Sequence, residues 1–309
     1  GVDCVGIGHG GDVRDLEKRR AIYSELPSDS LAFNGSSPSF GRWNLIRRFG
    51  NDYESPAIDL TIKRMRKWGL NTIANWSEPR VFDKNEMAFI VPMRDLGMDA
   101  QLMSLCDVYD PIYKKVIDES VSSFVAHFKG NPWLIGYFVS NEPSWINNET
   151  RLCQMILNGT ERPIKKALET YLAKNGDTVP NRRRFILETF DTFLSTVSEA
   201  LKKYDPDHLN LGIRFGDPDT LGEDLLEVCK RHFDVFSFNC YQLKPDAAML
   251  DRAAQILDLP MIVGEFHFGT IDRGLAQSLW QVDSQAERGV AYRYYVENPE
   301  ELPEDFQPQ

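Results

Sequence analysis

Two glutamates stand directly after short apolar runs, a position from which a carboxyl group can do acid–base or nucleophilic chemistry. Glu142 follows Phe138–Asn141 and precedes Pro143, and Glu265 follows Met261–Gly264. Parallel strands buried on both faces read as nearly continuous apolar runs, so each glutamate is expected at the carboxyl end of a strand. Two facing carboxyl groups hydrolyse a glycosidic bond when one protonates the leaving oxygen and the other attacks the anomeric carbon. The sequence therefore predicts a glycosidase with Glu142 as the acid and Glu265 as the nucleophile.

Simpler interpretations stay open for these residues. Asn141 and Glu142 can belong to an ordinary solvated loop, and Glu265 can be a buried structural carboxylate paired with an arginine. In the functional interpretation, Asn141 exchanges hydrogen bonds with a sugar hydroxyl next to the anomeric centre. Arg214 lies in the predicted strand 208–215 and can pair with a catalytic carboxylate or with Asp217.

Four further side chains are candidates for substrate binding. Tyr241 ends the predicted strand 233–241 and can hydrogen-bond Glu265, unless it is a core tyrosine. His267 lies two residues after Glu265 and either binds substrate or is a core histidine. Trp76 and Trp145 fall in predicted strand-end loops, where an indole can stack on a sugar face or anchor packing.

Strands alternate with helices along the chain, which is typical of βαβ units and a parallel sheet. The predicted order favours a (β/α)8 TIM barrel forming one catalytic domain over residues 1–309, with a loop insertion at 146–180, helical over 161–174, and a tail at 299–309. The pattern places strands at 2–7, 70–75, 99–105, 134–140, 208–215, 233–241 and 260–268, and helices at 58–68, 84–96, 111–129, 183–203, 220–231 and 246–257.

The eighth strand is missing from this pattern. The apolar run Val290–Val296 is one candidate for it, but Asp283–Glu287 reads as a capped helix start with acidic residues in the first turn. We therefore expect a helix over 284–297 and a barrel truncated before its eighth strand. Because the chain starts at Gly1 inside a predicted strand, we also expect its natural N-terminus to lie further upstream.

Composition limits the classes of partner. The formal net charge is −11, which disfavours nucleic acid and anionic membranes, because both require basic surfaces. No run approaches the roughly 20 apolar residues of a membrane-spanning helix, and no signal peptide is visible. The five cysteines contain no CxxC pair, so buried free thiols are expected, Cys4, Cys106 and Cys240 among them, and neither a metal site nor a cofactor is predicted.

The chain resembles the clan A glycoside hydrolases, retaining (β/α)8 enzymes whose acid/base glutamate follows an asparagine after strand four and whose nucleophile ends strand seven. Within the clan it looks most like the β-agarases of glycoside hydrolase family 50. The similar segments are Gly1–Gly6, Tyr204–Leu209, Gly212–Phe215, Gly264–Gly269 and Arg293–Glu297.

That resemblance implies a neutral galactan substrate such as agarose, cleaved at β-1,4 bonds by a secreted or periplasmic bacterial enzyme. It also implies that strand eight, which carries an aromatic residue at the floor of the sugar site, and an N-terminal β-sandwich are absent here. Two alternatives remain: another clan A exo-glycosidase such as a β-galactosidase, and a non-catalytic carbohydrate-binding relic. Oligomeric state is left open.

Overall fold

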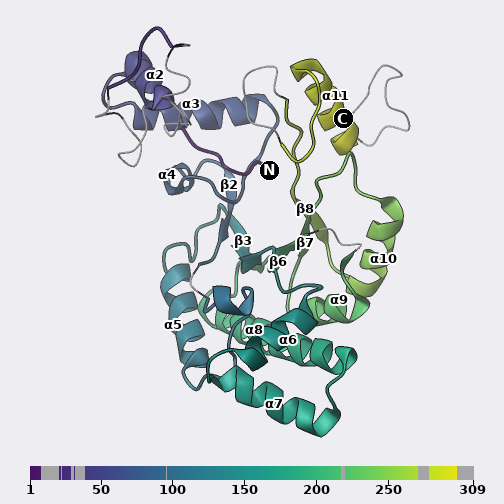
Figure 1. Cartoon of the computed structure of the whole chain (residues 1–309). Helices are drawn as coiled ribbons and strands as arrows, with labels where there is room; N and C mark the ends of the chain where they lie inside the picture. Colours follow the sequence, from purple (N-terminus) through teal and green to yellow (C-terminus); the bar gives the residue numbers. More distant parts are fainter. Residues whose placement is uncertain are drawn as a thin grey trace. The chain divides into compact units, whose positions relative to one another are not determined.

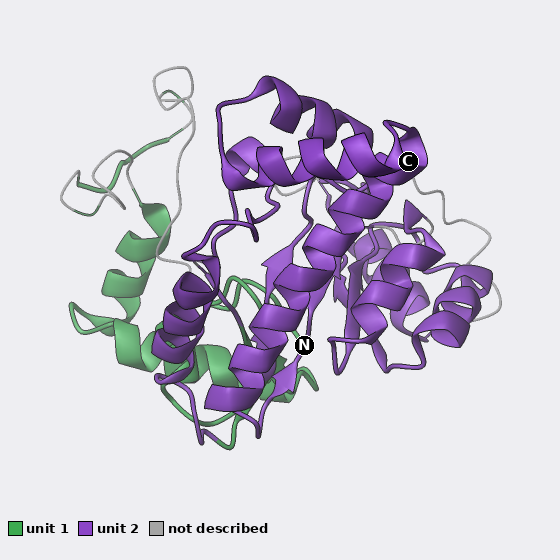
Figure 2. Ribbon diagram, turned by 90° about the horizontal axis from the view of Figure 1, so that it is seen from below, with its two compact units in different colours: residues 1–91, 132–135 green, residues 92–131, 136–309 purple. Residues whose placement is uncertain are grey.

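The computed structural model describes residues 1–7, 21, 23–28, 31, 39–94, 96–216, 220–270 and 278–297. The chain divides into two compact units, coloured separately in Figure 2. Unit 1 comprises residues 1–91 and 132–135, and unit 2 comprises residues 92–131 and 136–309. The tail at 299–309 and Asp217 lie outside the described residues. Within each unit the structure is mixed α/β with parallel strand pairs, as the alternating pattern predicts.

Unit 1 consists of helices around a short parallel strand pair. Strand β1 (Thr72–Ile73) pairs with β2 (Ala88–Pro92) through Thr72↔Ala88 and Ile73↔Phe89. Val2 adds an isolated parallel bridge to Ile73, and the predicted strand at 2–7 is reduced to this bridge because Cys4 has a left-handed φ of 58°. The helices of this unit are α2 (Phe40–Phe49), α3 (Glu54–Lys67) and α4 (Pro79–Phe82), with α3 containing most of the predicted helix 58–68.

Two predictions of secondary structure for adjacent segments are wrong. Residues 84–96 were expected to be helical but contain strand β2, whose alternate residues are buried. Residues 99–105 were expected to be a strand but form the short 3-10 helix η3 (Ala100–Leu102). Asp99 caps that turn by accepting a hydrogen bond from the Gln101 backbone, and the left-handed backbone of Met103 and Ser104 prevents extension. Periodicity alone cannot separate a short buried strand from a helix segment, and the parallel pairing of β2 with β1 selects the strand.

Unit 2 contains the sheet that carries both glutamates. Its strands lie in the order β4 (Ser140–Asn141), β6 (Ile213–Phe215), β7 (Phe236–Asn239) and β8 (Met261–Glu265), and all neighbours are parallel. Strand β3 (Leu134–Phe138), from Gly136 onwards, pairs in parallel with β5 (Leu209–Asn210). The strands predicted at 134–140, 208–215, 233–241 and 260–268 are therefore present, each shorter than expected.

Four helices of unit 2, α5, α6, α7 and α9, pack against the 26-residue α8, and Figure 1 shows α5, α6 and α7 gathered beside it. The predicted helices at 111–129, 183–203, 220–231, 246–257 and 284–297 are confirmed, and the segment 146–180 forms two helices where one was expected. These elements are α5 (Tyr113–Val125), α6 (Glu149–Asn158), α7 (Pro163–Asn175), α8 (Val179–Tyr204), α9 (Glu223–Lys230), α10 (Ala247–Leu257) and α11 (Gln285–Glu297).

Two local networks explain the start of α11 and the junction between α8 and β5. Ser284 Oγ accepts from Glu287 N at 3.2 Å while the Glu287 carboxylate accepts from Asp283 N at 2.8 Å, so α11 begins at the predicted cap. After α8, the buried Asp205 carboxylate accepts from Tyr137 Oη at 2.5 Å and contacts His208 Nδ1 at 2.8 Å. This second network fixes the segment that leads into β5.

Candidate active site

Glu142 comes directly after β4, and its backbone is held by the neighbouring strand. Its N–H donates to Arg214 O at 2.8 Å, which extends the pairing of β4 with β6 by one residue. Its φ is 41°, in the left-handed region that few residues other than glycine adopt. Backbone outliers of this kind cost about 1–3 kcal/mol and cluster at functional sites. The Glu142 side chain is exposed, so substrate and solvent can reach it.

The Glu142 carboxylate is fixed by a residue that the sequence analysis missed. Asn239 Nδ2 donates to Glu142 Oε1 at 2.7 Å. Asn239 is the last residue of β7 and its side chain is only 2% exposed. Asn239 could have been identified from the sequence, because it is a polar amide at the end of an apolar run. The same criterion identified the two glutamates.

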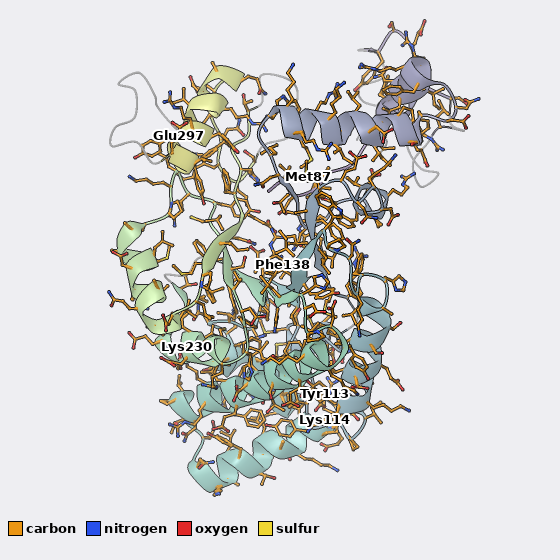
Figure 3. The ribbon with its side chains drawn as sticks, turned by 180° about the vertical axis from the view of Figure 1, so that it is seen from behind. Met87, Tyr113, Lys114, Phe138, Lys230 and Glu297 are labelled. Carbon is orange, nitrogen blue, oxygen red and sulfur yellow. The ribbon has the colours of Figure 1, made fainter. Side chains whose placement is uncertain are left out.

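Glu265 is the last residue of β8 and both of its carboxylate oxygens have donors. Arg214 Nη2 lies 3.0 Å from Oε1 and also donates to Gly264 O at 2.6 Å. The Tyr241 hydroxyl donates to Oε2. Arg214 is completely buried, and its guanidinium lies 5.5 Å from the ring centroid of Phe138, which is labelled in Figure 3. A buried cation and a hydroxyl hydrogen are therefore both directed at the Glu265 carboxylate.

Tyr241 connects the two carboxylates electrostatically. Its pKa is raised well above the ordinary value, chiefly by burial, then by the hydrogen bond to Glu265 and by the charges of Glu265 and Glu142. The hydroxyl therefore keeps its proton and can act only as a donor to Glu265 near neutral pH. The charges of both glutamates therefore act on this one hydroxyl.

His267 packs against the same tyrosine. The two rings make an edge-to-face contact with centroids 4.9 Å apart. His267 Nε2 accepts a hydrogen bond from Leu279 N at 3.2 Å. Partial burial lowers the pKa of His267, against the opposing effect of the Glu265 charge. The ring is therefore uncharged at neutral pH, and it braces Tyr241 from the side.

A β-bulge brings Glu265 into register with Asn239. Pairing between β7 and β8 runs Phe238↔Val263 and then Asn239↔Glu265, which leaves Gly264 as an extra residue on β8. Bulges occur next to active sites, where they change the direction of a side chain. A Cβ on Gly264 would lie 2.7 Å from Ser237 Oγ, 2.8 Å from Asn239 Oδ1 and 2.9 Å from Arg214 Nε. The site is therefore packed so closely that only glycine fits at the bulge.

The remaining predicted substrate contacts have different outcomes. Asn141 pairs with Arg214 across the strands, and its Oδ1 is buried with no hydrogen-bond partner among the described residues. Trp145 was expected to bind sugar, but it is 1% exposed and packs on Phe190 of α8 at 4.8 Å between ring centroids. The prediction for Trp145 is therefore wrong, because no indole face is left for a sugar. Trp76 belongs to unit 1 and is 45% exposed, and its role stays a prediction.

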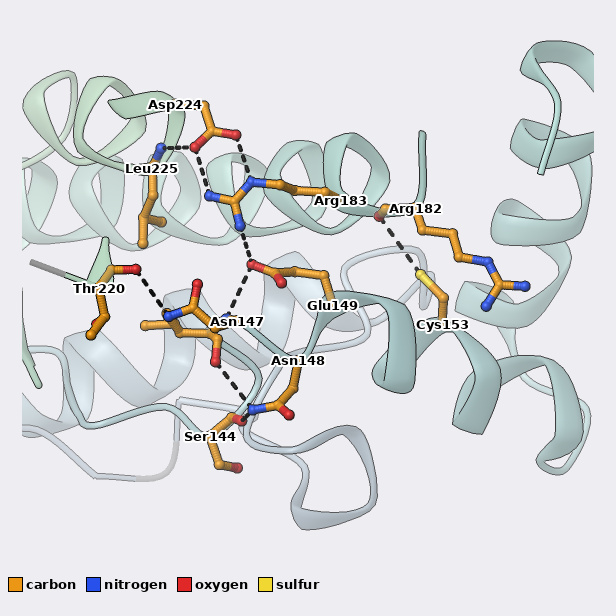
Figure 4. Close-up of polar contacts among 11 residues, drawn as sticks. Ser144, Asn147, Asn148, Glu149, Cys153, Arg182, Arg183, Thr220, Asp224 and Leu225 are labelled. Carbon is orange, nitrogen blue, oxygen red and sulfur yellow. Dashed lines mark hydrogen bonds and ion pairs between the residues drawn. The ribbon is translucent and has the colours of Figure 1, made fainter. Parts of the chain in front are cut away.

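The loop after Glu142 is anchored to the helices of unit 2. Figure 4 shows Arg183 of α8 joining Glu149 and Asp224, with Nη1–Oε1 and Nη2–Oδ1 distances of 2.6 Å. Asn147 Nδ2 donates to Thr220 O at 2.9 Å in the same network. These contacts tie the start of α6 to α8 and α9, so the chain that leaves the site is held on both sides.

Metal-ligating residues do not gather in the part of the chain that the structure describes, where no group of three His, Cys, Asp or Glu could hold an ion. Four of the five cysteines are buried free thiols, and Cys4 is exposed, contrary to the expectation for that residue. None of the helices in the described ranges is both long and apolar enough to cross a membrane.

The chain is similar to known agarases in sequence and in fold. No protein-family profile matches it. It is 29% identical to β-agarase B and 27% identical to β-agarase A of Vibrio sp. (strain JT0107), over 91% and 87% of this chain respectively. It covers only 36% and 34% of those proteins, about a third of their length. The crystal structure of an agarase, AgWH50C, superposes with a TM-score of 0.76 at 27% identity over 91% of this chain and 48% of that one.

Proposed function

We propose that this chain carries the catalytic centre of a retaining glycoside hydrolase that cleaves β-1,4-galactosidic bonds of a neutral galactan such as agarose. One observation carries the proposal: two glutamates at strand ends of one parallel sheet each receive side-chain donors, Glu142 from Asn239 and Glu265 from Arg214 and Tyr241. The similarity to β-agarases over 91% of the chain supports the substrate class.

The surroundings of each glutamate suit a different role. Glu265 is the nucleophile, because an attacking carboxylate must be ionised and Arg214 and Tyr241 both stabilise its charge. Glu142 is the acid/base, because it is exposed and can exchange its proton with a leaving group and with water. Asn141 and His267 contact the sugar beside them, and Trp76 is proposed as a stacking platform.

Retention of configuration requires a short distance between the carboxyl groups. We expect the carboxyl groups of Glu142 and Glu265 to lie about 5–5.5 Å apart in a crystal structure. Inverting enzymes separate the two groups by about 6.5–9.5 Å to admit a water molecule. Proton NMR of the first product formed would distinguish the two outcomes, because a retaining enzyme releases the β-anomer first.

Two further features, the fold and the location, are part of the same proposal. We propose that the parallel strands belong to a (β/α)8 barrel that is truncated before its eighth strand and forms a single catalytic domain, with α11 (Gln285–Glu297) as the seventh helix. The enzyme acts outside the cytoplasm, secreted or periplasmic, where a polymeric galactan is found.

Another exo-glycosidase such as a β-galactosidase is the second candidate, because the two-glutamate arrangement is common to both activities. A binding relic is disfavoured, because both carboxylates keep their hydrogen-bond partners.

The test is a reducing-sugar assay with agarose oligosaccharides, lactose and xylo-oligosaccharides, run on this chain and on a form extended at both ends. Turnover of agarose oligosaccharides alone supports the proposal, and preference for lactose supports the β-galactosidase. Binding of agarose without turnover by either form supports the relic and refutes the proposal.

Variants then separate the two roles. Glu265→Ala should abolish turnover, and azide should restore part of it by acting as an external nucleophile. Glu142→Ala should slow hydrolysis of the natural substrate much more than the glycosylation step of an activated aryl glycoside, because a good leaving group needs little protonation. Glu169→Ala, on the exposed face of α7, is the matched control and should behave as wild type.

A further inference from the structure

Both the backbone and the side-chain carboxylate of Glu142 are hydrogen-bonded to the same sheet. Its backbone N–H donates to Arg214 O on β6 at 2.8 Å, and its Oε1 accepts from Asn239 on β7 at 2.7 Å. Strands β6 and β7 are direct neighbours, paired through Arg214↔Ser237. An exposed glutamate usually samples several rotamers, so a second attachment through the carboxylate restricts the position of its oxygens.

Asn239 is suited to be that second attachment. It is 2% exposed, and its side-chain Oδ1 is buried without a hydrogen bond among the described residues. The bond to Glu142 therefore decides how the amide is oriented, because a reversed amide would set Oδ1 against a carboxylate oxygen. Gly264 makes room for this orientation, since a Cβ there would lie 2.8 Å from Oδ1.

We propose that Asn239 is the positioning residue of the acid/base: it occupies Oε1 of Glu142 and leaves Oε2 as the oxygen that carries the transferable proton. This inference rests on the proposed function. In the first step the proton moves from Oε2 to the glycosidic oxygen, the bond from that oxygen to the anomeric carbon breaks, and Glu265 bonds to the same carbon. In the second step Oε2 takes a proton from water, whose oxygen displaces Glu265.

Loss of the Asn239 amide should have a measurable consequence besides the loss of positioning. A hydrogen bond to an ionised group is stronger than one to a neutral group, so the bond from Asn239 is strongest when Glu142 is a carboxylate. Removing the amide should let Glu142 keep its proton to higher pH. Loss of a hydrogen bond to a charged group should move the alkaline limb of the kcat/KM profile upward by roughly one pH unit.

The test compares Asn239→Ala and Asn239→Asp with Ser237→Ala. Ser237 lies two residues earlier on β7, is completely buried, and its Oγ has no hydrogen bond among the described residues. Ser237→Ala is therefore the matched control for a polar group removed from the same strand, and its limb should not move. Both Asn239 variants should move the limb upward and should lower kcat/KM for galactan about tenfold or more, with less effect on the glycosylation step of an aryl galactoside.

A second readout does not need turnover. In protein labelled with 13C at the glutamate carboxyls, the Glu142 resonance is the one lost in Glu142→Gln. Its titration midpoint should move upward in Asn239→Ala and in the isosteric Asn239→Asp, but not in Ser237→Ala. Unchanged midpoints and limbs in folded Asn239 variants would overturn the inference, even if activity fell. If the midpoint shifts but the chain hydrolyses none of the glycans, the coupling between Asn239 and Glu142 stands and the proposed function is rejected.

Discussion

Gly264→Ala tests whether the bulge on β8 sets the geometry of both glutamates. Gly264 has no positive φ, so alanine causes no backbone strain there and the cost comes only from space. The added Cβ would lie under 3.0 Å from Ser237 Oγ, Asn239 Oδ1 and Arg214 Nε, distances at which the neighbours must move. Overpacking of a closely packed interior costs about 1–3 kcal/mol, and we expect the free energy of unfolding to fall by that amount.

The same substitution should also impair turnover. Arg214 holds both Gly264 O and the Glu265 carboxylate, and Asn239 holds Glu142, so the Cβ displaces the donors to both glutamates. A misplacement of about 1 Å in a catalytic group can cost about a hundredfold in rate. We therefore expect kcat/KM to fall by about a hundredfold in the same reducing-sugar assay.

Chemical denaturation and the activity assay on one preparation measure both effects. Gly216→Ala is the control, because this glycine follows β6, has no positive φ and would meet no atom within 4 Å. Its free energy of unfolding should be unchanged or slightly higher, since alanine restricts the unfolded chain. Gly264→Ala with wild-type stability and wild-type turnover would refute the argument that the bulge requires glycine.

Three further predictions concern the tyrosine, a buried carboxylate and the histidine. Tyr241→Phe removes a hydroxyl donor to Glu265 and should lower kcat about tenfold to a hundredfold, with a smaller change in Tm. Asp205→Ala leaves the tyrosine and histidine bonded to its carboxylate without a partner, and the free energy of unfolding should fall by about 3–5 kcal/mol in urea titrations. The pKa of His267 is lowered on folding, so the unfolded chain binds more protons below the ordinary histidine value of 6.5 and stability should fall as pH decreases through it. His267→Gln should lose this dependence, and equal slopes of unfolding free energy against pH from 5 to 7 in both proteins would contradict it.

Much of the helical pattern follows from local sequence. Helix α11 begins at the cap that Ser284 and Glu287 form, because side-chain to backbone bonds within four residues are decided locally. The short strand β2 was missed for the opposite reason. An apolar run of five residues suits a strand or a helix, and its parallel pairing with β1 selects the strand.

Whether a given side chain is buried also depended on tertiary contacts that cannot be inferred from the sequence. Trp145 lies three residues after Glu142 and suits a sugar platform by position alone. Its indole instead packs on Phe190, more than forty positions along the chain. Whether an aromatic side chain faces solvent or core is decided by the helix that packs over it, here α8.

The sequence by itself determined that two glutamates end apolar strands and that strands and helices alternate. Strand burial and helix capping depend on the types of residues that are close together in the sequence. Only the tertiary structure decided which donors each glutamate receives. The bonds from Asn239 to Glu142 and from Arg214 to Glu265 join separate strands. They depend on strand order, on register and on the bulge at Gly264, and a shift of one residue in the register would change which side chains meet.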